Sequence, residues 1–120
     1  TIVGTFTNPL GVAINPNGTQ AFVVNSTINT ERGISIIDIA TNAVVREITE
    51  LTLPTLIAIT PDGTKAYVTN SVTAGTVSVL DLTVPTFPVI ATIPVGDTPF
   101  GIAITPDGTR GYVANTLSGT

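Results

Sequence analysis

The side chains that carry most acid–base and nucleophilic chemistry are scarce in this sequence. Its 120 residues include no His and no Cys. Ser–His–Asp and Cys–His arrangements therefore cannot form, and zinc and copper lose their usual ligands. The carboxylates that remain show no spacing that selects a pair for glycoside chemistry; they include Glu31, Glu47, Glu50 and Asp97. We therefore predict no catalytic residue, no metal ligand and no cofactor in this chain.

A second set of oxygen-bearing side chains belongs to three Asx residues, each followed by glycine. The pairs are Asn17-Gly18, Asp62-Gly63 and Asp107-Gly108. One interpretation is a ring of oxygen ligands for a cation. We favour hairpin turns instead, because Asn–Gly and Asp–Gly between apolar runs supply the positive φ that tight turns need. Asp38 and Asp81 each end a later apolar run. We expect both to form local hydrogen bonds with the backbone that follows.

Composition and charge exclude two classes of partner. The net charge is −4, and the four basic residues lie far apart in sequence, so no cluster exists to bind nucleic acid. No apolar run approaches the ~20 residues needed to cross a membrane, so we predict no membrane insertion. Only 10% of residues are charged and mean hydropathy is +0.49. The resulting Thr- and Asn-rich surface favours a secreted or cell-surface protein, with the periplasm as the alternative.

Self-comparison reveals a repeat of 45 residues. Segments 9–25, 54–70 and 99–115 align, and the prolines at positions 16, 61 and 106 keep the same spacing. Each copy contains two β-rich runs joined by Pro-Asx-Gly-Thr, which predicts a hairpin. Two further strands follow, since residues 34–38 match 77–81 and residues 45–48 match 90–93. A Pro-rich turn at 83–88 is expected to protect a sheet edge.

Four antiparallel strands per repeat, here labelled a to d, predict an all-β fold of β-propeller type. We expect about 2.7 blades in one propeller segment. Residues 1–6 supply strand d of a preceding blade, residues 9–48 and 54–93 form two blades, and residues 99–115 form the first two strands of a third. An open arc exposes an apolar face at each end. The chain is therefore expected to be a fragment of a larger ring or one subunit of an oligomeric ring.

The sequence Tyr67-Val68-Thr69-Asn70 resembles the signature of the YVTN-type β-propeller repeat family. The other two copies read Phe22-Val23-Val24-Asn25 and Tyr112-Val113-Ala114-Asn115. The resemblance extends over nearly the whole chain and implies bacterial or archaeal surface-layer and envelope propellers, usually with seven blades. It is specific for the fold and carries little information about function.

Residues that differ between copies are the better candidates for a site. The loop after residue 25 is two residues longer than its counterpart after residue 70. In propellers the b–c and d–a loops emerge on one face, which predicts an interaction loop there; its candidate residues are Asn29, Glu31, Arg32, Glu50, Asp97 and Phe100. For Phe100 the alternatives are the channel mouth and, more simply, the core. Asn17-Gly18-Thr19 and Asn25-Ser26-Thr27 fit the glycosylation pattern at Asn17 and Asn25, a match that arises easily by chance.

Three functions are compatible with these observations, because a fold does not fix a function. The first is a non-catalytic surface scaffold or interaction module that presents loops to a protein or glycan partner. The second is part of a propeller enzyme of lactonase or cofactor-dependent dehydrogenase type, with active residues outside this segment. The third is a self-assembling structural subunit that closes a ring with other copies of itself.

Overall fold

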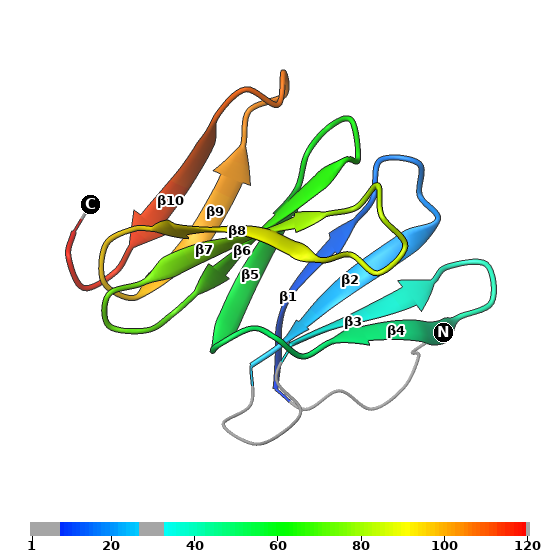
Figure 1. Ribbon diagram of the computed structural model, residues 1–120, viewed down its shortest axis with the longest axis horizontal. Coiled ribbons are helices and arrows are strands. Elements are labelled where there is room, and N and C mark those ends of the chain that lie inside the picture. The colour runs from blue at the N-terminus through cyan, green and yellow to red at the C-terminus, as the bar shows by residue number, and fades with distance from the viewer. Residues whose placement is uncertain (1–7, 27–32, 120) are drawn as a thin grey trace.

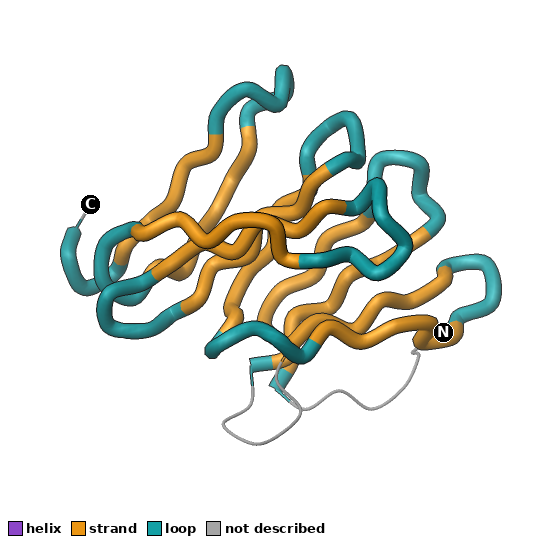
Figure 2. Tube along the Cα trace, in the orientation of Figure 1, coloured by secondary structure: helices purple, strands orange, loops and turns teal. Residues whose placement is uncertain are grey.

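A computed structural model describes residues 8–26 and 33–119 and consists of three antiparallel sheets that fan out from one another (Figure 1). The described residues contain no helix (Figure 2), and hence none that could span a membrane. The predicted all-β architecture of four-stranded antiparallel blades is confirmed as a partial propeller. Residues 1–6, predicted to form a strand of a preceding blade, lie outside the described residues.

Within each sheet, every strand pairs with the next one along the chain. The first sheet contains β1 (Pro9–Ile14), β2 (Gln20–Asn25), β3 (Gly33–Asp38) and β4 (Ala43–Ile48). The second contains β5 (Pro54–Ile59), β6 (Lys65–Asn70), β7 (Thr76–Asp81) and β8 (Val89–Pro94). The third contains β9 (Pro99–Ile104) and β10 (Gly111–Asn115). The first strands of the sheets lie side by side, with β5 in contact with both β1 and β9.

The main core lies between the first two sheets. Side chains alternate between the faces of a strand, so each sheet has one face for each neighbour. The first sheet contributes a large ring, Phe22, which is 1% exposed, and the second contributes the fully buried Val68. Around them lie the other core residues, Val24, Ile34, Ile36, Ile48, Leu51, Ile57, Ala66 and Leu80. This apolar contact holds the two sheets together.

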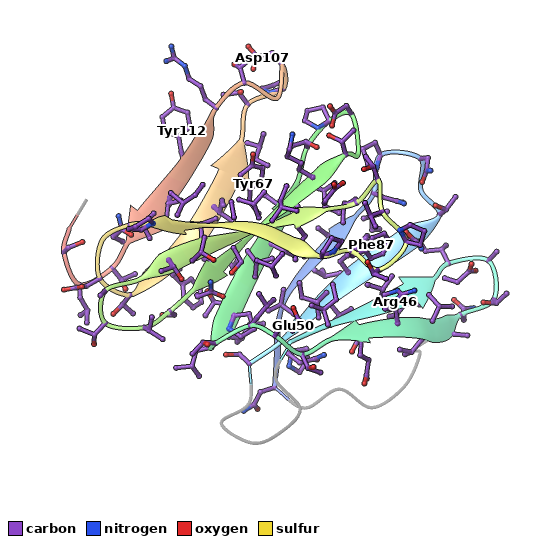
Figure 3. The ribbon with its side chains drawn as sticks, in the orientation of Figure 1. Arg46, Glu50, Tyr67, Phe87, Asp107 and Tyr112 are labelled. Carbon is purple, nitrogen blue, oxygen red and sulfur yellow. The ribbon has the colours of Figure 1, made fainter. Side chains whose placement is uncertain are left out.

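The Pro-rich loop between β7 and β8 takes part in this contact. It carries Phe87, whose ring centroid lies 5.9 Å from that of Phe22 in a tilted arrangement. The guanidinium carbon of Arg46 lies 5.9 Å from the centroid of the Phe87 ring, within cation–π range (Figure 3). Its prolines predict only a turn that protects a sheet edge, and its packing against the neighbouring sheet was not predicted.

The Pro-Asx-Gly-Thr turns stack on one another from sheet to sheet. Gly18, Gly63 and Gly108 have φ of 72°, 72° and 73°, as the turn prediction requires. A Cβ on Gly63 would lie 3.3 Å from Cδ of Pro16, and one on Gly108 would lie 3.3 Å from Cδ of Pro61. The second and third turns thus each place their glycine against the proline of the preceding turn.

We predict that Phe22→Ala lowers the free energy of unfolding by about 3–5 kcal/mol, because it leaves a cavity in the core. Tyr112→Ala is the matched control, since residue 112 is the equivalent position of the third sheet and is 61% exposed. Urea titrations at the lowest usable protein concentration should show a change within about 0.5 kcal/mol for the control. Equal losses in the two variants would contradict the assignment of the core.

We predict that Gly63→Ala costs about 1–3 kcal/mol, because alanine is strained at positive φ and its Cβ would press on Pro16. Gly18→Ala has the same φ, but its Cβ would meet no atom within 4 Å. Only the backbone strain remains there, so its loss should be smaller, about 1 kcal/mol. Thermal melts of the two variants measure the difference, and identical losses would show that turn stacking contributes nothing.

Candidate interaction edge

The loops between strands b and c and between strands d and a gather at one edge of the sheets. We call residues 8 and 26, the loops 49–53, 71–75 and 95–98, and residues 116–119 the loop edge. Its backbone is tied by a hydrogen bond that recurs in every copy. Ser26 N donates to Asn8 O at 3.0 Å, Ser71 N to Leu53 O at 2.9 Å, and Thr116 N to Thr98 O at 3.1 Å. The residue that follows strand b is therefore fixed to the residue that precedes strand a.

The acceptors of this recurring bond have an unusual backbone conformation. Asn8, Leu53 and Thr98 have φ of 49°, 47° and 53°, and each precedes a proline. Left-handed φ is uncommon outside glycine, and for a β-branched residue such as Thr98 it is a true outlier. Such conformations persist only where the surrounding structure enforces them, and they gather at functional sites.

Further bonds join the b–c loop of the second sheet to the d–a loop that leads from it to the third. Thr98 N donates to Val72 O at 3.1 Å, and Val95 N donates to Gly75 O at 2.9 Å. Ala74 N donates to Oδ1 of Asp97 at 2.9 Å. The Asp97 carboxylate therefore helps to fix the loop, although the residue itself is exposed. These contacts make the loop edge an ordered surface.

The residues predicted for the interaction site do not all lie together in the structure. Asn29, Glu31 and Arg32 lie outside the described residues. Glu50 is exposed on the loop edge, at the end of the sheets opposite the Asp107 turn (Figure 3). Phe100 is 44% exposed, so the expectation that it packs in the core is wrong; its carbonyl oxygen accepts a bond from Thr69 Oγ1 at 3.0 Å. Within the described ranges, no hydrogen bond or ion pair joins Glu50 to Asp97.

Buried Asn–Ser pairs join strands b and c next to the loop edge. Nδ2 of Asn25 donates to Oγ of Ser35 at 2.9 Å, and Nδ2 of Asn70 donates to Oγ of Ser78 at 2.8 Å. These pairs were not predicted, although Ser recurs at the same place of strand c in both full copies. Asn25 is only 7% exposed and its Nδ2 is engaged, so this geometry does not suit a glycan acceptor in the folded chain. Asn17 is exposed, and its glycosylation stays a prediction.

The Asx side chains of the turns bond to nearby threonines. Oδ1 of Asp62 accepts bonds from Oγ1 of Thr60 at 2.6 Å, from Thr64 N at 3.0 Å and from Thr64 Oγ1 at 2.8 Å. Asp107 repeats the pattern with Thr105 and Thr109. No group of three or more acidic residues in the described part of the chain could hold a metal ion. The turn chemistry we favoured accounts for these oxygens without a cation.

The same hydrogen bonds stabilise the charged carboxylates. The bond from the Thr60 hydroxyl, followed by the Thr64 amide and hydroxyl, lowers the pKa of Asp62 to about 2. The Thr105 hydroxyl is the main cause that lowers the pKa of Asp107 to about 2. The predicted local bonds after strand c are also present, since Thr41 N donates to Oδ1 of Asp38 at 2.9 Å and Thr83 N donates to Oδ1 of Asp81 at 2.9 Å. The bonds from Thr41 and Thr83 lower the pKa values of these two carboxyl groups.

Comparison with known proteins places the fold among propellers. No protein-family model and no curated protein matches the chain. Hydrazine synthase of Kuenenia stuttgartiensis superposes with a TM-score of 0.82 at 32% identity, over 97% of this chain and 31% of that protein. A Bacteroides fragilis protein proposed to be a 6-phosphogluconolactonase has a TM-score of 0.80 at 19% identity, over 98% of this chain and 35% of its own.

A gluconolactonase of Xanthomonas campestris has a TM-score of 0.74 at 14% identity, over 94% of this chain and 36% of that one. At these low sequence identities, the similarity to the two sugar-lactonase structures is evidence for the fold alone. The chain spans about a third of the length of the solved structures it matches.

We predict that stability falls as pH is lowered from about 4 to about 2, because the turn carboxylates have a lower pKa folded than unfolded. Their contribution is present above the unfolded pKa, near 3.9, and is lost on protonation. The double variant Asp62→Asn and Asp107→Asn should flatten this decline, since Asn17 fills the same position in the first turn. Urea titrations between pH 2 and 5 measure the effect, and an unchanged slope in the double variant would refute it.

Proposed function

We propose that this chain is a non-catalytic interaction module whose loop edge binds a protein or glycan partner. The recurring backbone bond between the residues around strands a and b supports this proposal, because it fixes the loops without using their side chains. Affinity is favoured where a surface is ordered before it binds, since less entropy is lost on association. Exposed residues of the edge, such as Glu50, Thr73 and Ala74, are then free to make contacts.

We further propose that the chain belongs to the YVTN-type repeat family and acts outside the cell or in the periplasm. Support for the family comes from Tyr67 to Asn70 and from the buried Asn–Ser pair that uses the last residue of this motif. Support for the location comes from the Thr- and Asn-rich composition, in which few residues are charged.

A second candidate is a part of a propeller enzyme of lactonase or dehydrogenase type. The likeness to the Xanthomonas gluconolactonase and to the Bacteroides protein favours it. In that case residues outside this segment would supply the chemistry, since the described residues bring no acid–base pair together.

A photo-crosslinking amino acid placed at position 50 tests the main proposal, with the same substitution at position 17 as the matched control. Both residues are exposed; residue 50 lies in the β4–β5 loop of the loop edge, whereas residue 17 lies in the Pro-Asx-Gly-Thr turn between β1 and β2. Incubated with cell-envelope extracts and purified polysaccharides, the variant at position 50 should form adducts several-fold more often. Equal labelling at both positions would contradict the proposal.

A further inference from the structure

One of the three Pro-Asx-Gly-Thr turns carries an amide where the other two carry a carboxylate. Asn17 occupies in the first turn the position of Asp62 in the second and of Asp107 in the third, and all three residues are exposed. Asn17 is also the only asparagine of the sequence that is followed by glycine. Glycine has no Cβ to shield its backbone nitrogen, so this nitrogen can approach the side-chain carbonyl carbon of the preceding asparagine.

The turn supplies two hydrogen-bond donors to the carbonyl oxygen of the Asn17 side chain. Oδ1 of Asn17 accepts bonds from Thr19 N at 3.1 Å and from Thr19 Oγ1 at 2.7 Å. Donors at this oxygen polarise the carbonyl group and stabilise the negative charge that develops on it when a nucleophile adds to Cγ. Both bonds join residues that are only two apart in sequence, so they can persist when longer-range bonds of the turn open.

The nucleophile is restrained by one such longer-range bond. Gly18 N donates to Asn15 O at 2.9 Å, and this N–H must be released before its nitrogen can react. None of residues 15–19 belongs to the apolar core, so the end of this hairpin can open without disturbing the contact between the sheets. We therefore expect the reaction to proceed through local opening of the turn, more slowly than in the unfolded chain.

The second turn shows that the folded chain accommodates the product. Oδ1 of Asp62 accepts bonds from Thr64 N at 3.0 Å and from Thr64 Oγ1 at 2.8 Å. These are the same two bonds that Thr19 makes to Asn17. An aspartate at position 17 would therefore retain both of them, and bonds to a charged acceptor are stronger than bonds to a neutral one.

We propose that Asn17 is a site of spontaneous deamidation in the folded chain and that the turn closes again around the resulting aspartate. Gly18 N attacks Cγ of Asn17, the bond from Cγ to Nδ2 breaks, and Nδ2 leaves as ammonia with the proton of the Gly18 N–H. Water then adds to Cγ of the succinimide, which breaks the bond to Gly18 N and returns a proton to it. Attack of water on the backbone carbonyl instead gives isoaspartate. Water is the only co-reactant consumed.

Deamidation would change the chemistry of this surface in two ways. It replaces a neutral amide by a carboxylate, so the net charge of −4 becomes more negative by one. It also removes the predicted glycosylation acceptor at Asn17, so each molecule can carry one modification or the other. This inference goes beyond the proposed function and does not depend on it, because Asn17 lies in the β1–β2 turn and not on the loop edge.

Peptide mapping by mass spectrometry tests the proposal on the unglycosylated chain, incubated folded in a mildly alkaline buffer. Asn17 should exchange its amide for a carboxylate many-fold faster than Asn42. Asn42 is the matched control, because it is also exposed and in a turn with φ of 55°, but is followed by Ala43. The same chain in guanidinium chloride should lose the Asn17 amide faster still. The proposal would be overturned if Asn17 kept its amide in the folded chain or if Asn42 reacted equally fast.

Two variants test whether the turn accommodates the product. Asn17→Asp should have the melting temperature of the unreacted chain at neutral pH, because the carboxylate keeps both bonds from Thr19. Asn17→Ala has no acceptor oxygen and should melt at a lower temperature. Far-UV circular dichroism checks that both variants retain the sheets. If Asn17→Asp melted as low as Asn17→Ala, the claim that the turn closes around aspartate would be wrong.

Discussion

The structure depends on the packing of one face of a sheet against the opposite face of the next. A four-stranded sheet of this length cannot bury its apolar side chains alone, and neighbouring repeats supply the missing surface. Phe22 and Val68 illustrate the requirement, because both come from small sheets and both are buried where two sheets meet. The loops, the turns and the exposed ends all take their positions from this contact.

Much of the fold could be predicted because it is encoded locally and three times. The Asx–Gly corners fix the hairpins, and alternating apolar residues fix which face each strand buries. Contacts between segments that are distant in sequence were harder to predict. Phe87 lies in a loop whose prolines suggest only an irregular turn, and nothing in the sequence near it points to Phe22. The exposure of Phe100 was also misjudged, since an aromatic residue in a strand is ordinarily expected to be buried.

The candidate site was harder to predict than the fold. Its location followed from the order of strands in a propeller, but its construction did not. The hydrogen bond from Ser71 N to Leu53 O involves only main-chain atoms, so no residue type in the sequence predicts it. The left-handed backbone conformation of Leu53 and Thr98 could not be predicted either, because glycine or asparagine is the usual residue at positive φ. The buried partner of Asn70, Ser78, could have been found from one weak signal, because the same position of strand c is a serine in both full copies.

Main-chain construction of the loop edge also has a consequence for variation. The residue after strand b is Ser, Ser or Thr, and the residue before strand a is Asn, Leu or Thr, yet the bond between them has nearly the same length in every copy. A scaffold assembled in this manner tolerates exchange of its surface chemistry while its frame stays constant. Natural drift or a combinatorial library could therefore diversify recognition at these positions without redesigning the sheets beneath them.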